Sequence, residues 1–372
     1  MRRKVIFLSV LLLQMPAPGF SLGIQEEVGL YFPEFRKAPM IAERPVFGMY
    51  GRELGRLALM STQKQYLEAI YLEGKGACVP LLFGRGRPFL RDALAKSEES
   101  ARIMTNTRLG QEGRIDPALL VRGGPLHYWA RIGYSRNGKP VGSFLFDLMS
   151  QKVEPTDSLW DQQSDGKRRL EARWPVKEKE PRKVKLLASV PNYSLYLSDR
   201  ATCLGMMLGY WANQRHSEWI QTRASENDRK GNTGNPPPRD WIKEIDLLGK
   251  GCFDCQSIEK TVEFFSQSRG FPVTVRAFDG KALDGSRSSF RVIQDLVDRE
   301  SHPFLLEDKA SQPFRYAVGI GYLVAGGWPF VACLIPSAES VGGPWQEAFI
   351  NWEFDFEHFR IFQMMPLEGK VN

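Results

Sequence analysis

Residues 199–211, which read DRATCLGMMLGYW, place a thiol near the start of an apolar helix. The apolar side chains recur at the i, i+3, i+4, i+7 spacing of a helix with one face in the core, at Leu204, Met207, Leu208 and Trp211. The free N–H groups and the dipole at a helix N-terminus stabilise a thiolate, so Cys203 is a candidate nucleophile. Asp199 directly precedes the predicted helix, and an aspartate there is expected to act as its N-cap.

A nucleophilic cysteine also needs a histidine as its base and a group that orients the histidine. The four histidines are His127, His216, His302 and His358. His216 lies about 20 Å from Cys203 along the same helix, at 1.5 Å per residue. His302 precedes a proline, and His358 lies in an aromatic C-terminal segment. An active peptidase would therefore pair Cys203 with His302 or His358. The alternative is an inert core cysteine, which its apolar neighbours favour.

The order of three short motifs resembles the papain-like domain of bacteriocin-processing cysteine peptidases and their exported relatives. The family's first motif is roughly CxPTxxAMxxGYW, and the matching residues in register are Thr202, Met206, Gly209, Tyr210 and Trp211. Its second motif, Gly-His-Ala-Val followed by Gly-Tyr, corresponds to RYAVGIGY at residues 315–322. Its third element, a strand that ends in Asp-Pro, corresponds to FVACLIP at residues 330–336. The segments 290–297 and 301–306 resemble the helix and strand that precede the histidine motif. The resemblance covers roughly residues 190–336.

The same correspondence leaves each catalytic position of the family without its residue. Asp199 stands at the position of the nucleophile, Tyr316 at that of the histidine and Ile335 at that of the orienting aspartate. A tyrosine hydroxyl, with a pKa of about 10, cannot accept a proton at neutral pH. The resemblance therefore implies a catalytically degenerate domain. Asp199, Arg200 and Tyr316 would rim its cleft and bind a peptide or protein partner.

The N-terminus predicts export. Residues 1–4 are charged, residues 5–15 are apolar and residues 16–23 are small or turn-forming, which is the pattern of a signal peptide. The apolar run of about 11 residues is shorter than the roughly 20 that span a bilayer. We therefore expect a signal peptide at 1–23, a secreted or periplasmic mature chain and no membrane span; a retained N-terminal anchor is the lesser alternative.

The net charge of +7 is unevenly distributed. Three of the positive charges belong to residues 2–4, and residues 167–185 contain nine basic and three acidic residues. The rest of the mature chain is therefore close to neutral. Such a distribution fits a solvated linker better than a nucleic-acid-binding surface, so no nucleic-acid partner is expected.

The predicted architecture is α+β in two domains. Residues 24–172 form an α+β domain of unassigned role, 173–185 a basic linker, and 186–372 a papain-like domain with a helix packed on an antiparallel sheet and an aromatic C-terminal extension. Asn137-Gly138 between two aromatic-rich runs predicts a β-hairpin of residues 127–134 and 141–148. We also predict an extended segment at 24–45, helices at 51–60 and 92–104, a helix or strand at 64–72, and an edge strand at 353–359.

The remaining cysteines do not indicate a cofactor. Cys252 and Cys255 form a single CxxC without a second pair or a histidine pair, so a zinc site is not expected. Their flanks read as a turn and a helix, which favours a local disulfide or two thiols over a thioredoxin-like redox site. No metal and no cofactor are predicted.

Overall fold

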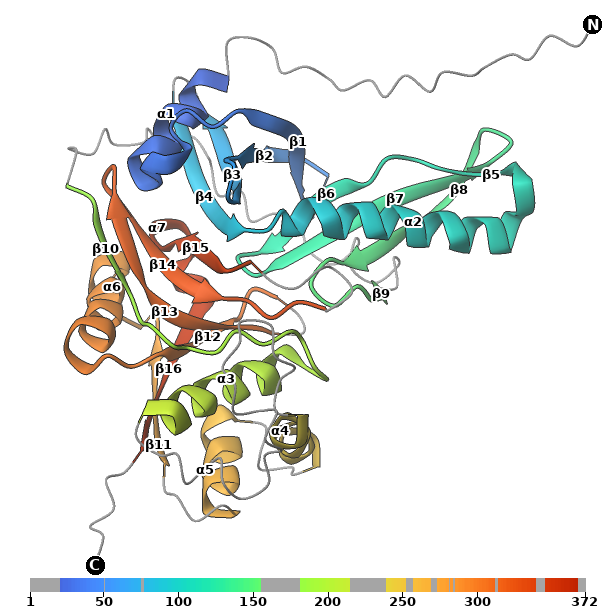
Figure 1. Cartoon of the computed structure of the whole chain (residues 1–372). Coiled ribbons are helices and arrows are strands. Elements are labelled where there is room, and N and C mark those ends of the chain that lie inside the picture. Colours follow the sequence, from blue (N-terminus) through green and yellow to red (C-terminus); the bar gives the residue numbers. More distant parts are fainter. Residues whose placement is uncertain are drawn as a thin grey trace, which may run out of the picture.

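The computed structural model describes residues 21–49, 51–74, 77–154, 181–214, 239–251, 257–268, 273–280, 282–283, 285–311, 314–338 and 345–366. It has a mixed α+β architecture, with helices packed around one large, mostly antiparallel sheet (Figure 1). The predicted α+β class is confirmed.

The strands follow one another in the order β11-β16-β12-β13-β14-β15-β4-β3-β2-β1-β6-β7-β8-β9, with β10 beside β13 and β5 beside β7. Their bounds in the N-terminal half are β1 Met40–Gly48, β2 Glu53–Ser61, β3 Tyr66–Gly74, β4 Ala77–Gly86, β5 Gly113–Ile115, β6 Leu119–Gly124, β7 His127–Arg136, β8 Lys139–Asp147 and β9 Val153–Glu154. In the C-terminal half they are β10 Lys183–Leu186, β11 Val273–Asp279, β12 Phe304–Asp308, β13 Arg315–Ala325, β14 Trp328–Leu334, β15 Glu347–Asn351 and β16 Phe359–Pro366.

The first described segment begins with a helix, where the sequence predicted an extended chain. Helix α1 (Ser21–Tyr31) buries Ile24, Val28 and Tyr31 completely. Their i, i+4, i+7 spacing is the helical signal that the nearby prolines obscured. The chain then passes through the 3₁₀ turn η1 (Pro33–Phe35) into β1.

Residues 51–60 contain a strand instead of the predicted short helix. Strand β2 pairs with β1 on one side and with β3 on the other. Its residues 57–60 are all buried, and a strand covered on both faces has no period-2 pattern. The ambiguous segment at 64–72 also forms a strand, β3.

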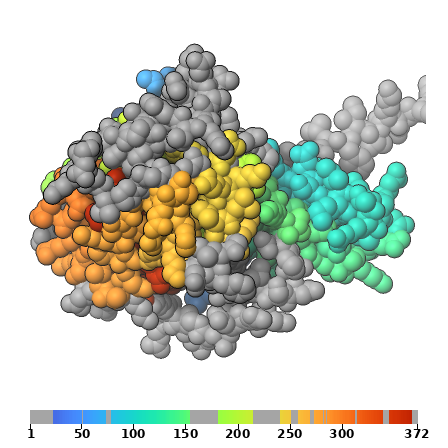
Figure 2. All heavy atoms as spheres, turned by 90° about the horizontal axis from the view of Figure 1, so that it is seen from below, coloured from blue at the N-terminus to red at the C-terminus, as the bar shows by residue number. Residues whose placement is uncertain are grey.

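The predicted hairpin is confirmed and forms part of a projecting arm. Strands β7 and β8 pair antiparallel around Asn137 and Gly138, whose φ angles of 51° and 76° fit the tight turn. Helix α2 (Phe89–Leu109), which includes the predicted helix at 92–104, lies along these strands. Figures 1 and 2 show that α2, β7 and β8 extend together away from the rest of the molecule.

Helix α3 (Asp199–Gln214) is more deeply buried than its sequence predicted. Residues 201–212 are buried on every side and not only along one stripe. The helix packs against β12 and β13 on one side and against the helix α4 (Arg239–Gly251) on the other (Figure 1). Helix α5 (Ile258–Ser268) packs in turn on α4. A Cβ atom on Gly205 would lie 2.9 Å from the side chain of Ile242 on α4, so a glycine permits this close approach.

The segments that carry the motif correspondence form the predicted elements. Helix α6 (Gly285–Asp295) continues through the π-helical turn η5 (Leu296–Glu300) and leads to β12, and the motifs at 315–322 and 330–336 lie in β13 and along β14. Residues 353–359, in contrast, are not an edge strand. Residues 353–358 lie in α7 (Trp352–Asp355) and the turn η7 (Phe356–His358), and the Asn351 side chain caps α7 by accepting a hydrogen bond from Glu353 N at 3.1 Å. Phe359 begins β16, which pairs with a strand on each side.

The sheet crosses the predicted boundary between the two halves. Strand β15 pairs with β4, and the rings of Phe330 and Phe83 lie 5.2 Å apart in a hydrophobic core that includes side chains from both halves. A buried ion pair joins Arg122 on β6 to Asp355 on α7 at 2.8 Å. The division into two domains stays a prediction.

Two predicted segments fall partly outside the described residues. Of the signal peptide at 1–23 only residues 21–23 are described, and they begin α1. Residues 173–185 were predicted to form a basic linker. The last three of them instead belong to strand β10, which pairs with β13. Lys183 and Lys185 both form ion pairs with Asp298, at 3.4 and 3.3 Å, which fixes this end of the segment. None of the helices in the described part of the chain has both the length and the apolarity of a membrane span.

Candidate functional site

The N-terminus of α3 is capped by Ser198 and not, as predicted, by Asp199. Ser198 Oγ accepts a hydrogen bond from Ala201 N at 3.3 Å, and Ser198 O accepts one from Thr202 N at 3.0 Å. The Ser198 hydroxyl also donates to Asp246 Oδ1 at 2.7 Å. Asp199 is thus the first helical residue, and its carboxylate is available for contacts with the sheet.

The Asp199 carboxylate joins the helix to β13. Oδ1 accepts a hydrogen bond from Arg200 N at 2.8 Å, and Oδ2 accepts one from Tyr316 N at 3.2 Å. Oδ2 also lies 3.7 Å from Nη1 of Arg315. Burial raises the pKa of Asp199, while the Arg315 charge and the two backbone donors act against this rise. The residues aligned with the family's nucleophile and histidine are therefore direct neighbours.

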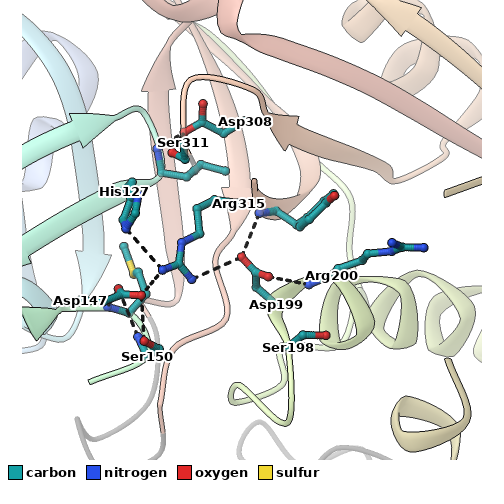
Figure 3. A network of polar contacts seen from close by, with 12 residues as sticks. His127, Asp147, Ser150, Ser198, Asp199, Arg200, Asp308, Ser311 and Arg315 are labelled. Carbon is teal, nitrogen blue, oxygen red and sulfur yellow. Dashed lines mark hydrogen bonds and ion pairs between the residues drawn. The ribbon is translucent and has the colours of Figure 1, made fainter. Parts of the chain in front are cut away.

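Arg315 extends this contact to the N-terminal half of the chain (Figure 3). Its guanidinium forms a hydrogen-bonded ion pair with Asp147, whose side chain is completely buried at the end of β8. The same Nη2 atom lies 3.3 Å from Nε2 of His127, at the start of β7. One arginine thus bridges two carboxylates and an imidazole from α3, β8 and β7.

The neighbours of His127 determine which of its ring nitrogens carries the hydrogen. A guanidinium only donates hydrogen bonds, so Nε2 of His127 accepts and Nδ1 carries the hydrogen. Nδ1 is buried and has no hydrogen-bond partner among the residues that the structure describes, and the ring packs on Trp129 with centroids 3.7 Å apart. Burial, followed by the Arg315 charge, lowers the pKa of His127 to about 3. The imidazole is neutral in the folded protein at physiological pH.

Asp147 and Asp308 each organise a turn beside the network. The Asp147 carboxylate accepts hydrogen bonds from Met149 N at 2.9 Å and from the Ser150 hydroxyl at 2.8 Å. Asp308 Oδ2 accepts from the Ser311 hydroxyl at 2.8 Å and, across the halves, from Leu126 N at 3.1 Å. Both carboxylates therefore stabilise the local backbone, and Asp308 also connects the two halves of the chain.

The Tyr316 hydroxyl points away from Asp199. It donates to Glu307 Oε1 at 2.9 Å, on the neighbouring strand β12. The other oxygen of Glu307 lies 3.4 Å from Nη1 of Arg360. Burial and the Glu307 charge raise the pKa of Tyr316, so this hydroxyl does not replace a catalytic base.

Arg200 does not join the other two predicted binding residues. Its guanidinium donates to the Thr261 hydroxyl of α5 and lies against Gly249 of α4. Figure 3 shows the side chain directed away from Asp199 and Arg315. The structure therefore brings Asp199 and Tyr316 together, and directs Arg200 toward the helices.

Cys203 has the surroundings of a core residue. Its side chain is completely buried, as is that of Cys333 on β14. Burial, the Asp199 charge and Cys333 together raise the pKa of the Cys203 thiol well above its ordinary value. This is the opposite of the shift that activates a nucleophile.

The two histidines considered as partners of Cys203 have other contacts. The ring of His302 packs on Trp211, near the far end of α3, with centroids 4.6 Å apart. Trp211 is eight residues beyond Cys203, about 12 Å along a helix. Nδ1 of His302 lies 3.2 Å from Glu300 Oε2, and His358 belongs to the turn η7.

The remaining predictions concern Ile335 and the CxxC pair. Ile335 is buried directly after β14, as expected for a core position. Cys252 and Cys255 lie outside the described residues. In the described ranges, no three histidine, cysteine or acidic side chains come together to form a possible metal site.

Sequence reasoning missed the residues at the centre of the network, His127, Asp147 and Arg315. A weak signal existed, because each is a charged or titratable residue at the end of a strongly apolar strand. Nothing in the sequence, however, indicated that the ends of β7, β8 and β13 meet.

Comparisons with known proteins give no family for this chain. No protein-family model matches it, and no curated protein sequence matches it.

Proposed function

We propose that this chain is an exported, non-catalytic protein with a degenerate papain-like domain, which binds a peptide or protein partner. The observation that carries the non-catalytic part of the proposal is the contact between Asp199 and Tyr316 N at 3.2 Å; the partner is what the resemblance implies. The two motifs that resemble the family's nucleophile and histidine motifs lie side by side at this contact, which supports the proposal. Neither position offers the thiolate or the imidazole that this kind of peptidase uses.

The other polar contacts of these residues support a structural role. The Asp199 carboxylate is engaged by Arg315 and by two backbone N–H groups, and the Tyr316 hydroxyl is engaged by Glu307. Buried charges that are paired and hydrogen-bonded in this way hold elements in place. The proposed non-catalytic protein would thus use the former catalytic position to join α3, β13 and the hairpin β7–β8.

A labelling experiment separates this proposal from an active peptidase that uses Cys203. The folded chain is treated with an electrophilic cysteine-peptidase probe across a pH series, and modified cysteines are identified by mass spectrometry. We expect Cys203 to stay unlabelled until the protein is unfolded, because its thiol is buried and its pKa is raised. Partly exposed Cys78 reports that the reagent is active.

Peptidase assays complete the test. The chain is incubated with a peptide library, and cleavage is compared between the wild type and Cys203→Ala. No cleavage above background is expected in either protein. Selective labelling of folded Cys203, or cleavage that disappears in Cys203→Ala, would contradict the proposal.

A further inference from the structure

The tip of the projecting arm carries a local excess of positive charge. We define the arm tip as residues 102–116 and 134–141, which are the end of α2, the strand β5 and the turn between β7 and β8. Its basic residues are Arg102, Arg108, Arg114, Arg136 and Lys139, and all five are exposed. Its acidic residues are Glu112 and Asp116. Outside residues 2–4 and 167–185 the chain as a whole is close to neutral, so the excess at the tip is not a consequence of overall composition.

Strand pairing brings these cations to one end of the arm. Arg136 and Lys139 face each other across the Asn137-Gly138 turn, and Arg114 pairs with Ser135 on the next strand. Arg108 reaches the same end from α2, with its guanidinium 5.4 Å from the centroid of the Phe144 ring. Within the described part of the chain, one of these five cations, Arg136, forms an ion pair with an acidic residue of the tip, Glu112, at 2.8 Å.

We infer that the arm tip docks on a surface of anionic phospholipid. Figure 2 shows the arm as a convex projection from the body of the molecule. A convex end with cations around it fits a broad, planar, negatively charged surface, where each lysine or arginine contributes independently. Val141 and Ile103 add aliphatic surface at the tip, with 51% and 61% of their area exposed. Cationic and aliphatic side chains together are the combination that binds at a lipid headgroup interface.

Single-stranded nucleic acid fits the tip less well. Its binding depends on aromatic rings that are free to stack on bases. The rings of Tyr134 and Phe144 instead stack on each other, with centroids 4.6 Å apart and an interplanar angle of 22°. This inference is independent of the proposed loss of catalysis, because the tip is remote from α3 (Figure 1).

The test measures partitioning of the full chain onto vesicles by co-sedimentation. Vesicles of phosphatidylcholine alone are compared with vesicles that also contain phosphatidylglycerol. The tip variant Arg108→Gln, Arg114→Gln, Lys139→Gln is compared with the control variant Arg276→Gln, Arg287→Gln, Arg291→Gln, which removes three exposed cations elsewhere. Both variants retain the apolar N-terminus, so its contribution to binding cancels in the comparison. Circular dichroism and thermal unfolding verify that both are folded.

We expect the wild type to prefer the anionic vesicles, and this preference to decrease between about 0.1 M and 1 M salt, as the Debye length falls from about 10 Å to 3 Å. The tip variant should partition on the order of 100-fold more weakly, about five-fold for each cation, and the control variant about as well as the wild type. Equal binding to both kinds of vesicle, or equal losses in the two variants, would overturn the inference. Tighter binding to an oligonucleotide or to polyglutamate, lost in the tip variant, would also overturn it in favour of a polyanionic partner.

Discussion

The Asp199 carboxylate on α3 accepts a hydrogen bond from the backbone N–H of Tyr316 on β13, across 3.2 Å and 117 positions of sequence. In the family that the sequence resembles, these positions hold the nucleophile and the base. In this chain the contact is made by a carboxylate and a main-chain nitrogen, and the Tyr316 side chain is directed to Glu307. The contact positions the helix against the sheet without providing a reactive pair.

Replacement of Asp199 tests how much stability this contact provides. Asp199→Ala should lower the free energy of unfolding by about 2 kcal/mol, because a buried N–H group loses its acceptor. Asp199→Asn should cost less, since an amide oxygen can still accept one of the two backbone hydrogen bonds. Urea unfolding monitored by tryptophan fluorescence measures both. If the Asp199→Ala protein is as stable as the wild type, the contact between Asp199 and Tyr316 N contributes nothing to the free energy of unfolding.

Arg315→Met should be the most damaging single change in the network. It leaves the completely buried Asp147 without its ion-pair partner, and breaking a buried pair from one side costs about 3–5 kcal/mol. Arg299→Gln is the control, because Arg299 is 79% exposed in an i,i+4 pair and should change stability by about 0.5 kcal/mol or less. Adding Asp147→Asn to Arg315→Met should recover part of the loss. If Asp147→Asn instead adds to the loss, unpaired charge is not the cause.

His127 should make the protein less stable in mild acid. Its pKa is lowered to about 3 in the folded state, whereas an unfolded histidine titrates near pH 6.5. Between these values the unfolded state binds more protons, so stability decreases as the pH falls. Relative to His127→Gln, the wild type should lose about 2 kcal/mol between pH 6.5 and pH 5, at about 1.4 kcal/mol per pH unit. Denaturant unfolding of both proteins at each pH measures this difference, and parallel profiles would contradict it.

Glu68 should make the protein less stable as the pH rises, which is the opposite of the effect expected for His127. Its buried carboxyl group accepts hydrogen bonds from Leu90 N and Arg91 N at the start of α2 and from Trp345 Nε1. Burial outweighs these donors and raises the pKa of Glu68 to about 7. The folded state therefore holds a proton that the unfolded state releases above pH 4.5, and stability decreases as the pH rises from 4.5 to 7.

The pH profile of Glu68→Gln should lack this decrease. The difference between wild type and variant should change by up to about 1.4 kcal/mol per pH unit in this interval and become constant above pH 7. His127→Gln serves as a comparison, since its profile should deviate from the wild type with the opposite sign. If the stability of both variants deviates from the wild type with the same sign as the pH changes, then either the lowered pKa of His127 or the raised pKa of Glu68 is wrong.

The hairpin at the arm tip offers a test of backbone conformation alone. Gly138 has a φ of +76°, and a Cβ atom added there would meet nothing within 4 Å. Gly138→Ala should therefore cost about 1 kcal/mol through conformational strain and not through a clash. Thermal unfolding measures the change. Gly138→Asn, which tolerates a positive φ better, should be less destabilising than Gly138→Ala.

Much of the fold could be predicted where the local pattern was unambiguous. The hairpin around Asn137-Gly138 and the helix within 92–104 depend on local periodicity and turn chemistry. The helix and strands at 290–297, 301–306, 315–322 and 330–336 were expected from the family resemblance. The segments 24–31, 51–60 and 353–358 were predicted wrongly. In β2 burial on both faces removed the alternation, and α7 is capped by a single side chain, Asn351.

The sequence by itself determined that Asp199, Tyr316 and Ile335, which the resemblance aligns with catalytic residues, supply neither a thiolate nor an imidazole, since side-chain identity alone excludes both. Only the tertiary structure decided what these positions do instead. Arg315 meets Asp147 and His127 because β13 lies beside the base of the hairpin β7–β8. Such a contact depends on the packing of strands more than 160 residues apart in sequence, and no local pattern encodes it.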